Sequence, residues 1–279
     1  MNHISKQYRC YLCGATDHKE IVRLRHKPEG ETDYGIPADQ YDRVITQCLN
    51  CLVYTNQHEL LSSAMYEGAY NASISLGSIR ERYDKVMNLP PEKSDNRQRV
   101  QRIADFLQAK DIALDDCDVL DVGSGTCVFL GAMKALGPRC ACIDPDPQAV
   151  KHAQEYVGLP IAHAGTLDDF PYEKKFDLIT FNKVLEHVKD PVNMLEKAER
   201  LLKEGGFVYV ELPEGARAEQ QAIVAQRQEF FVEHYTIFNE FSFRKLAERA
   251  GFETQEIEII TEPSGKLTIY GFLSKSTKK

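Results

Sequence analysis

The segment 119-VLDVGSGT-126, together with 142-CIDP-145 further along the chain, has the pattern of two buried strands that each end in a polar turn. The first turn contains Gly123 and Gly125, and the second contains Asp144. Glycine lets a ligand approach the backbone closely, and an acid after the second strand is placed to bind ribose hydroxyls. The pattern therefore predicts a nucleoside-containing cofactor at the carboxyl ends of two parallel strands.

Asp121, just before the glycine turn, distinguishes between two classes of cofactor. A carboxylate would repel the pyrophosphate of a dinucleotide, but it would attract the ammonium at the methionine end of S-adenosylmethionine (SAM). The third glycine of the G-x-G-x-x-G pattern is also absent, because Val128 stands there. We therefore expect SAM rather than NAD. The cofactor-binding residues predicted from these two turns are Asp121, Gly123, Ser124, Gly125, Asp144 and Pro145.

The composition is ordinary for a globular protein, with 279 residues, 43% of them hydrophobic and 27% charged. The net charge of -8 makes nucleic acid an unlikely partner, since binding phosphates requires a basic surface. The sequence has no run of about 18 apolar residues and no apolar signal core at its start. We therefore expect no membrane span and a cytoplasmic location.

The cysteines fall into two groups. One group forms two Cys-x-x-Cys pairs: Cys10, Cys13, Cys48 and Cys51. The other lies in or beside apolar strands, where small buried residues are expected: Cys117, Cys127, Cys140 and Cys142. Four thiolates suit a tetrahedral Zn²⁺, which would stabilise a region with little core of its own. Redox cysteines are the alternative, but they usually begin a helix in a thioredoxin-like pattern that this segment lacks. We therefore predict a structural zinc.

The chain divides into a predicted zinc-binding module over residues 1–58, a helical linker or lid over 59–96, and a cofactor-binding domain over 97–279. In the linker, Tyr66 and Tyr70 could cover the cofactor or could simply pack.

From residue 97 on, strands and helices alternate, which implies a parallel sheet with right-handed crossovers. The last two strands form a hairpin around 262-EPSG-265, so the sheet should end with an antiparallel strand. The predicted strands are 118–122, 139–143, 160–164, 176–181, 207–212, 252–260 and 266–273. The predicted helices are 96–110, 127–136, 147–156, 192–203 and 241–250.

This order resembles the class I SAM-dependent methyltransferases. The resemblance rests on VLDVGSGT, CIDPD, GTLDDFPY, FDLITFNKVLEHVKDP and LLKEGGFVYVELP, and it covers residues 97 to 275. It implies an α/β, Rossmann-like fold with a seven-stranded sheet whose last strand is antiparallel. SAM would lie across the ends of the first, second and fourth strands, as the switch-point rule for open sheets requires.

Carried over by position, the resemblance places Asp121, Gly123 and Gly125 at the methionine end of SAM and Asp144 at the ribose. It places Thr166 and Leu167 along the adenine, and Asn182 near the sulfonium. Two positions depart from the family. Cys127 stands where glycine is frequent, and Thr166 stands where aspartate is frequent, with Asp168 as a neighbouring substitute.

The four-cysteine module also resembles one found on methyltransferases of sugar and surface-polysaccharide pathways, including sugar C-methyltransferases. There too the module precedes a tyrosine-containing segment and the catalytic core. This resemblance implies an activated sugar or a similar small polar molecule as acceptor.

Methyl transfer to a hydroxyl or a carbon acid requires a base. His187, which follows the fourth strand, and His234, which follows the fifth, are the candidates, and Tyr235 could hydrogen-bond the substrate. The alternative for each is a packed loop residue. The segment LEHV resembles a ubiquinone-pathway O-methyltransferase type that has an acid three residues before its Glu-His pair. Lys183 stands at that position here, which argues against a catalytic metal.

The sequence therefore favours a SAM-dependent methyltransferase that acts on a small polar acceptor, with a nucleotide-activated sugar or a polysaccharide precursor preferred. O-methylation is favoured over C-methylation. The alternatives are a protein or RNA methyltransferase that grips a macromolecule with its zinc module, and a SAM-binding module without catalysis. No pattern indicates the oligomeric state.

Overall fold

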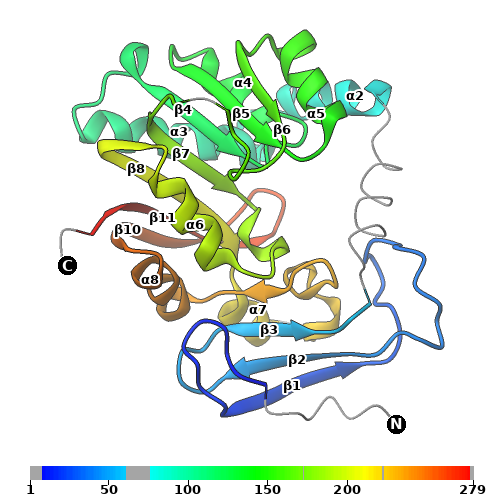
Figure 1. The fold of residues 1–279 in the computed structure, drawn as a ribbon. Coiled ribbons are helices and arrows are strands. Elements are labelled where there is room, and N and C mark those ends of the chain that lie inside the picture. Colours follow the sequence, from blue (N-terminus) through cyan, green and yellow to red (C-terminus); the bar gives the residue numbers. More distant parts are fainter. Residues whose placement is uncertain (1–7, 61–75, 172, 222, 277–279) are drawn as a thin grey trace.

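The computed structural model describes residues 8–60, 76–171, 173–221 and 223–276. A seven-stranded sheet forms the centre, in the order β10-β11-β8-β7-β4-β5-β6 (Figure 1). Its strands are β4 (Asp118–Val122), β5 (Arg139–Asp144), β6 (Ile161–Ala164), β7 (Phe176–Asn182), β8 (Leu202–Pro213), β10 (Phe252–Thr261) and β11 (Leu267–Lys275).

The topology confirms the predicted fold class. β4, β5, β6, β7 and β8 pair in parallel, whereas β11 runs antiparallel to both β8 and β10. The expected strands are all present. β4 is buried at every position, as expected for a central strand covered on both faces.

Helices cover both faces of this sheet. One face packs against α3 (Asp95–Ala109), α4 (Val128–Lys134) and α5 (Pro147–His152), and α2 (Leu76–Met87) contacts α4 and α5. The other face packs against α6 (Pro191–Glu199) and α8 (Glu240–Arg249). α7 (Gly215–Gln221) follows β8. Short 3-10 turns lie at Pro91–Lys93, Leu114–Asp116, Leu185–His187, Val224–Gln226 and Gln228–Phe230, and a π-helical turn lies at Ala153–Val157.

The helix predicted over 192–203 is too long, because α6 ends at Glu199 and β8 begins at Leu202. Residues 203–206 form an irregularity in the pairing, since Phe176 lies opposite Leu202 but Leu178 lies opposite Phe207. Gly205, with a φ of 74°, allows this bend. Gly205 and Gly206 thus lie within β8, where they interrupt its regular pairing.

The N-terminal region forms a second, antiparallel sheet in the order β1-β2-β3-β9 (Figure 1). Its strands are β1 (His18–Leu24), β2 (Arg43–Cys48), β3 (Tyr54–Gln57) and β9 (Thr236–Ile237). The fourth strand comes from the C-terminal half of the chain. Cys10, Leu12 and Cys48 also belong to the same apolar cluster as the large sheet. The module therefore shares its sheet and core with the rest of the protein, which suits a segment too short to bury a core alone.

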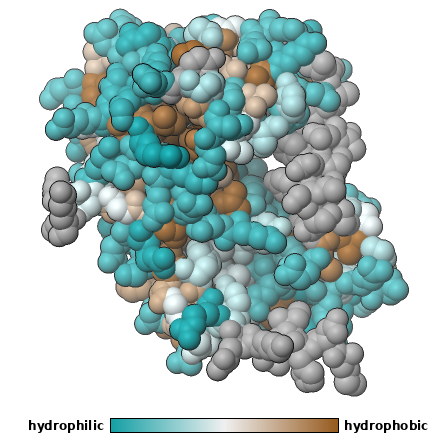
Figure 2. Space-filling view, viewed as in Figure 1, coloured by the Kyte–Doolittle hydropathy of each residue, from teal (hydrophilic) through white to brown (hydrophobic). Residues whose placement is uncertain are grey.

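Tyr66 and Tyr70 lie outside the described residues, so the prediction that they cover the cofactor stays a prediction. Within the part of the chain that is described, no helix is both long and apolar enough to cross a bilayer. The face seen in Figure 2 is largely hydrophilic, with small hydrophobic areas between polar ones.

Candidate active site

A cavity of about 540 Å³ lies at the carboxyl ends of β4, β5 and β7. Predicted cofactor residues that line it are Gly123, Asp144, Pro145, Thr166 and Leu167. Apolar side chains also line it: Val122, Ile143, Val184, Val188 and Met194. A cavity with a few polar groups in an apolar wall, at the switch point of an open sheet, suits a nucleoside.

The glycine turn adopts backbone conformations in which other residue types would be strained. Gly123 and Gly125 have φ values of 75° and 50°. A Cβ on Gly123 would come within 2.7 Å of Val184 Cγ2, so only glycine fits there. Cys127 begins α4 with a φ of 63°, and it is buried. Glycine adopts this left-handed conformation without strain, which explains why glycine suits position 127. Cys127 adopts the same conformation here.

Asp144 is fixed at the cavity wall by two peptide groups. Its Oδ2 accepts a hydrogen bond from Gly125 N at 2.7 Å, and its Oδ1 accepts one from Asp146 N at 2.9 Å. Burial raises the pKa of Asp144. Its carboxylate is thus preorganised at the cavity, where ribose hydroxyls could donate to it.

Asp121 lies behind the cavity rather than in its wall. It is 2% exposed, and its Oδ1 accepts hydrogen bonds from Thr180 Oγ1 at 2.6 Å and from Asn182 Nδ2 at 2.8 Å. Burial raises the pKa of Asp121 to about 6. Ser124 Oγ donates to the Asp121 carbonyl at 3.0 Å. Asp121 and Ser124 therefore stabilise the turn by hydrogen bonds on the side away from the cavity.

Asn182 is oriented by Asp121. Because its Nδ2 donates to Asp121, its Oδ1 faces elsewhere, and that oxygen is buried without a hydrogen-bond partner among the described residues. An unpartnered buried acceptor is costly unless a ligand satisfies it. The ammonium at the methionine end of SAM is such a donor, so the residues present fit this cofactor.

At the other end of the cavity, Thr166 is held by Asp169. Thr166 N and Oγ1 both donate to Asp169 Oδ1, at 2.6 and 3.1 Å. Asp168 does not line the cavity, and its Oδ2 pairs with Lys197 Nζ at 2.5 Å. The structure thus uses Asp169, rather than Asp168, to shape the turn around Thr166.

A second cavity, of about 380 Å³, adjoins the first. Charged and titratable side chains dominate its wall: Lys183, Glu186, His187, Glu229, Glu233, His234 and Lys266. Lys183 and His187 line both cavities. The two cavities therefore meet at these side chains.

His187 and His234 lie together in the second cavity, although they come from different segments. His187 Nδ1 is 3.0 Å from Glu233 O, and His234 Nδ1 is 2.9 Å from Glu229 O. A carbonyl only accepts, so each Nδ1 carries the proton and each Nε2 carries the lone pair. Burial lowers the pKa of both imidazoles, and both rings are therefore neutral near pH 7.

Tyr235 does not line either cavity. Its ring stacks on His58, with centroids 5.5 Å apart, and its N donates to Glu186 O at 2.8 Å. The ring of Tyr235 thus packs against His58, and a hydrogen bond from Tyr235 to the substrate stays a prediction.

Glu186 is a site residue that the sequence patterns did not single out, although it lies in the LEHV segment. It is 1% exposed, and its Oε2 has no hydrogen-bond partner among the described residues. Burial raises the pKa of Glu186 to about 8. One carboxyl oxygen of Glu186 and one ring nitrogen each of His187 and His234, the atoms that could bind a metal ion, lie within 4.8 Å of one another. Lys183 brings a positive charge to the same wall, which opposes cation binding.

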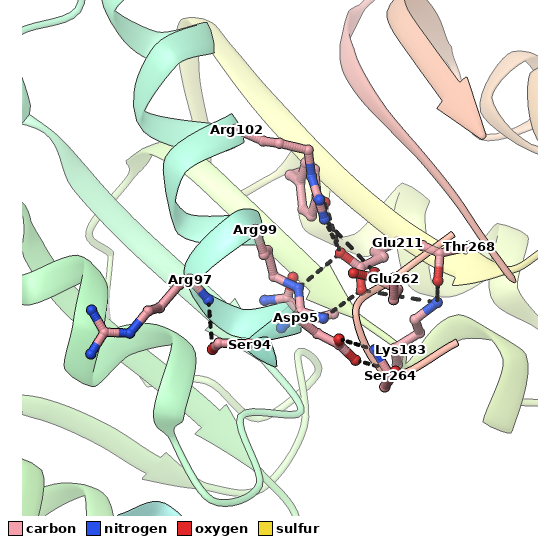
Figure 3. A network of polar contacts seen from close by, with 12 residues as sticks. Ser94, Asp95, Arg97, Arg99, Arg102, Lys183, Glu211, Glu262, Ser264 and Thr268 are labelled. Atoms are coloured by element: carbon pink, nitrogen blue, oxygen red, sulfur yellow. Dashed lines mark hydrogen bonds and ion pairs between the residues drawn. The ribbon is translucent and has the colours of Figure 1, made fainter. Parts of the chain in front are cut away.

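Lys183 is anchored by the polar network in Figure 3. Its Nζ donates to Thr268 Oγ1 at 2.6 Å and lies 3.9 Å from Glu211 Oε1. Glu211 also accepts from Arg99 Nε at 2.8 Å and from Arg102 Nη2 at 3.0 Å. Burial opposes ionisation of Glu211, but these cations outweigh it and hold its pKa well below the usual range. The network thus fixes a lysine where the two cavities meet.

The four N-terminal cysteines converge as the spacing predicted. Cys10 Sγ lies 3.5 Å from Cys51 Sγ, and Cys13 Sγ lies 3.5 Å from Cys48 Sγ. The four sulfurs lie within 4.8 Å of one another and form no disulfide. A tetrahedral zinc with Zn–S of about 2.3 Å needs sulfurs roughly 3.8 Å apart, so the donor set fits zinc.

The two Cys-x-x-Cys turns have matching backbones. Gly14 N donates to Cys10 O at 2.7 Å, and Leu52 N donates to Cys48 O at 2.9 Å. Gly14 has a φ of 75°, and Leu52 has a φ of 59°. Leu52 thus adopts the left-handed conformation that glycine provides in the first turn.

The other four cysteines are buried, as the sequence predicted: Cys117, Cys127, Cys140 and Cys142.

A family model described as a methyltransferase domain matches residues 89–257. A ubiquinone biosynthesis O-methyltransferase from Actinobacillus pleuropneumoniae serotype 7 is 36% identical over 116 residues, which is 38% of this chain and 49% of the relative. A protein of the same name from Xanthomonas campestris pv. campestris is 33% identical over 112 residues, 38% of this chain and 46% of the relative. The chain thus spans about half the length of these curated relatives.

Solved structures show the same fold. A 1,6-didemethyltoxoflavin-N1-methyltransferase from Burkholderia thailandensis, solved with its substrate and S-adenosylhomocysteine, aligns with a TM-score of 0.55 at 19% identity, covering 84% of this chain and 96% of that one. A magnesium protoporphyrin IX methyltransferase from Synechocystis PCC 6803, with bound S-adenosylhomocysteine, gives 0.57 at 15% identity, covering 76% and 100%. The family model matches more than half of this chain, so the chain belongs to the methyltransferase domain family.

Proposed function

We propose that this methyltransferase uses SAM to methylate a hydroxyl group of a small polar acceptor, preferably a nucleotide-activated sugar or a polysaccharide precursor. The observation that carries the proposal is the junction of two cavities at Lys183 and His187. One cavity has the features of a nucleoside site and the other is polar. Their contact would let a methyl group pass from a cofactor in one to an acceptor in the other.

The first cavity suits SAM at three points. Asp144 offers a fixed carboxylate for ribose. Asn182, which precedes the lining residue Lys183, has an unpartnered buried carbonyl that an ammonium could satisfy. Gly123 provides the positive-φ turn at the cavity wall. SAM supplies an activated methyl group on a sulfonium, so the protein needs only to align the acceptor and manage its proton.

The second cavity suits an acceptor with several hydroxyl groups. Glu186 and Glu233 each have a buried carboxyl oxygen without a hydrogen-bond partner among the described residues, and both line this cavity. Hydroxyl groups, which can donate and accept, would satisfy these oxygens, as those of a sugar ring could. The names of the curated relatives, which are O-methyltransferases, support transfer to oxygen.

His234 is the proposed general base, with His187 beside it. The acceptor oxygen would form its bond to the methyl carbon as the bond from that carbon to sulfur breaks, and the hydroxyl proton would pass to His234 Nε2. Because Nδ1 of His234 is engaged with the Glu229 carbonyl, the ring presents its basic nitrogen on the opposite side.

We also propose that Cys10, Cys13, Cys48 and Cys51 hold a structural zinc ion, away from the reacting atoms. The convergence of the sulfurs and the matching turns support this role. Cys₄ sites of this kind are closed, because all ligand positions are taken by the protein.

The test combines binding and transfer. Calorimetry should show binding of SAM and S-adenosylhomocysteine, and no comparable binding of NAD. Tritiated SAM is then incubated with UDP-glucose, dTDP-glucose, GDP-mannose and a deproteinised bacterial extract, with total bacterial protein and RNA in parallel. Label in the small-molecule fraction supports the proposal. Label confined to protein or RNA would contradict the acceptor class, and NAD binding without SAM binding would contradict the cofactor.

A further inference from the structure

The N-terminal module holds the segment that carries His234 by hydrogen bonds to the backbone of that segment. Arg43 Nη1 donates to Phe230 O at 2.7 Å, and Asn56 Nδ2 donates to Phe231 O at 3.1 Å. Asn56 N donates to Tyr235 O at 2.9 Å. Three carbonyl groups of residues 230–235 therefore accept hydrogen bonds from residues more than 170 positions earlier in the sequence.

Two further contacts fix the middle of this segment. Val232 N donates to Glu31 Oε2 at 2.8 Å, and Val232 O lies 2.8 Å from His58 Nε2. β9 then continues the attachment, since Thr236 pairs with Thr55 of β3. The module thus contacts this wall of the second cavity on both sides of Glu233 and His234.

At the centre of these contacts is a buried ion pair. Arg43 Nη2 and Glu31 Oε2 are 2.8 Å apart, and their side chains are 1% and 0% exposed. Arg43 Nε donates to Tyr41 OH at 2.8 Å, and Tyr41 OH donates to Glu31 Oε1. Burying two charges is costly, and an apolar pair could stabilise a fold as well, so such a pair suggests a requirement for specific geometry.

The loop that carries Glu31 reaches the cavity itself. Gly30 and Thr32, on either side of Glu31, line the second cavity together with His234. A Cβ on Gly30 would lie 3.7 Å from Phe231 Cζ, so the loop and the 230–235 segment are in close contact. Glu31 therefore points into the protein while its two neighbours face the space where an acceptor would bind.

We propose that the N-terminal module forms part of the acceptor-binding wall, and that Glu31 and Arg43 are positioning residues that hold this wall and His234 in place. The module then contributes to acceptor selection and not only to stability. The inference rests on the proposed role of the second cavity. Among the described residues, those that line the cofactor cavity lie between Val122 and Met194, so the module should not affect cofactor binding directly.

The first experiment fills the cavity from the module side. Thr32→Trp places a large ring at the lining, and Glu29→Trp places the same ring on an exposed residue of the same loop that does not line the cavity. Transfer from tritiated SAM is counted in the acceptor fraction that the wild type labels. We expect Thr32→Trp to raise the KM for the acceptor by at least tenfold, while the Kd for S-adenosylhomocysteine stays within twofold. Glu29→Trp should match the wild type in both. Unchanged transfer by Thr32→Trp would overturn the inference.

The second experiment tests the positioning role. Glu31→Gln removes the charge opposite Arg43, and Asp42→Asn removes a partly exposed charge that pairs with Arg23 in the same module. Hydrogen exchange should become faster across 230–235 in Glu31→Gln but not in Asp42→Asn. The acceptor kcat/KM should fall at least tenfold in Glu31→Gln alone, with the Kd for S-adenosylhomocysteine within twofold of the wild type.

The two proposals fail in distinguishable ways. A wild type that binds SAM but labels no fraction would remove the proposed function, and the exchange measurement would still decide whether Glu31 holds the wall. A wild type that labels an acceptor, with unchanged exchange and kinetics in Glu31→Gln, would remove the positioning role alone.

Discussion

The imidazole rings of His187 and His234 lie edge to face, with their centroids 4.9 Å apart and their planes at 62°. His187 follows β7 at the junction of the two cavities, whereas His234 belongs to the segment that precedes β9. Each ring is oriented through Nδ1 by a backbone carbonyl. Two neutral bases are thereby held side by side where the acceptor is proposed to bind.

His234→Asn should lower kcat by about 10²-fold, because a positioned general base contributes roughly 10²–10⁴-fold. The Kd for S-adenosylhomocysteine should not change, since His234 does not line the cofactor cavity. His26→Asn, at an exposed histidine, is the matched control and should keep full activity. Wild-type kcat in His234→Asn, measured with the acceptor that the wild type labels, would exclude this residue as the base.

The pH profile should reflect the burial of these histidines. Burial, with a contribution from the neighbouring His187, lowers the pKa of His234 well below its ordinary value of 6.5. A base acts in its neutral form, so kcat/KM should stay level as the pH falls to 6.5 and should decline only in more acidic solution. The decline should be absent from the residual activity of His234→Asn. An acidic limb centred at or above pH 6.5 would contradict a buried imidazole as the base.

The sequence predicted the large sheet well because its strands and turns are determined by local patterns. The buried run at β4 and the Asp144 turn needed no distant partner to be recognised. The pairing of β9 with β3 could not be predicted, because a two-residue strand has no periodicity and depends on a surface far away in the sequence.

The candidate site shows the same division. The cysteine spacing predicted that four sulfurs would converge, and they do. Of the predicted cofactor residues, those that line the cavity are Gly123, Asp144, Pro145, Thr166 and Leu167. The burial of Asp121 and the unpartnered oxygen of Glu186 arise from packing between distant segments, so no motif contained them. The contacts of Glu31 with Arg43 and Val232 likewise join three separate segments.

Asp121→Asn should change how stability depends on pH. Burial raises the folded-state pKa of Asp121 to about 6, above its unfolded value. The stabilisation from its protonated form is therefore complete below about pH 4 and is lost as the pH rises through 6. At 1.36 kcal/mol per pKa unit, a shift of about 2 units corresponds to roughly 3 kcal/mol.

Urea unfolding of the cofactor-free protein at pH 4, 5, 6 and 7 measures this effect. The free energy of unfolding of the wild type, minus that of Asp121→Asn, should fall by about 3 kcal/mol from pH 4 to pH 7. Asp105→Asn, on the exposed side of α3, is the matched control for removing a carboxyl group. A flat difference for Asp121→Asn would show that its carboxyl titrates normally.

Asp144→Asn should weaken cofactor binding by roughly 10- to 100-fold, since hydrogen bonds to a charged group contribute about 1.5–3 kcal/mol. It also alters the contact with Gly125 N that fixes the glycine turn. Asp168→Asn is the control, because Asp168 pairs with Lys197 and does not line the cavity. Titration calorimetry with S-adenosylhomocysteine should show a normal Kd for Asp168→Asn. A reversed order of the two variants would assign the cofactor contact to Asp168 instead.

Removing one cysteine from the N-terminal cluster should remove the metal. The wild type is expected to purify with zinc and Cys48→Ser without it. Cys140→Ser should retain the metal, although Cys48 and Cys140 are both buried, at 1% and 4% exposure. Metal content is measured by mass spectrometry of the purified proteins. Zinc retained at the wild-type level by Cys48→Ser would contradict a four-cysteine site.

Loss of the metal should also destabilise α8, because the second Cys-x-x-Cys turn is hydrogen-bonded to the residue that caps the start of that helix. Asn239 Nδ2 donates to Leu52 O at 2.8 Å, and Asn239 is the N-cap of α8. At the other end, Arg249 Nη1 donates to Leu12 O at 2.8 Å in the first turn. Metal binding energy is folding energy at such sites, so chelation should lower the Tm of the wild type and speed amide exchange in α8. Cys48→Ser should already show both changes without a chelator, and exchange in α5, on the opposite face of the large sheet, should stay as in the wild type.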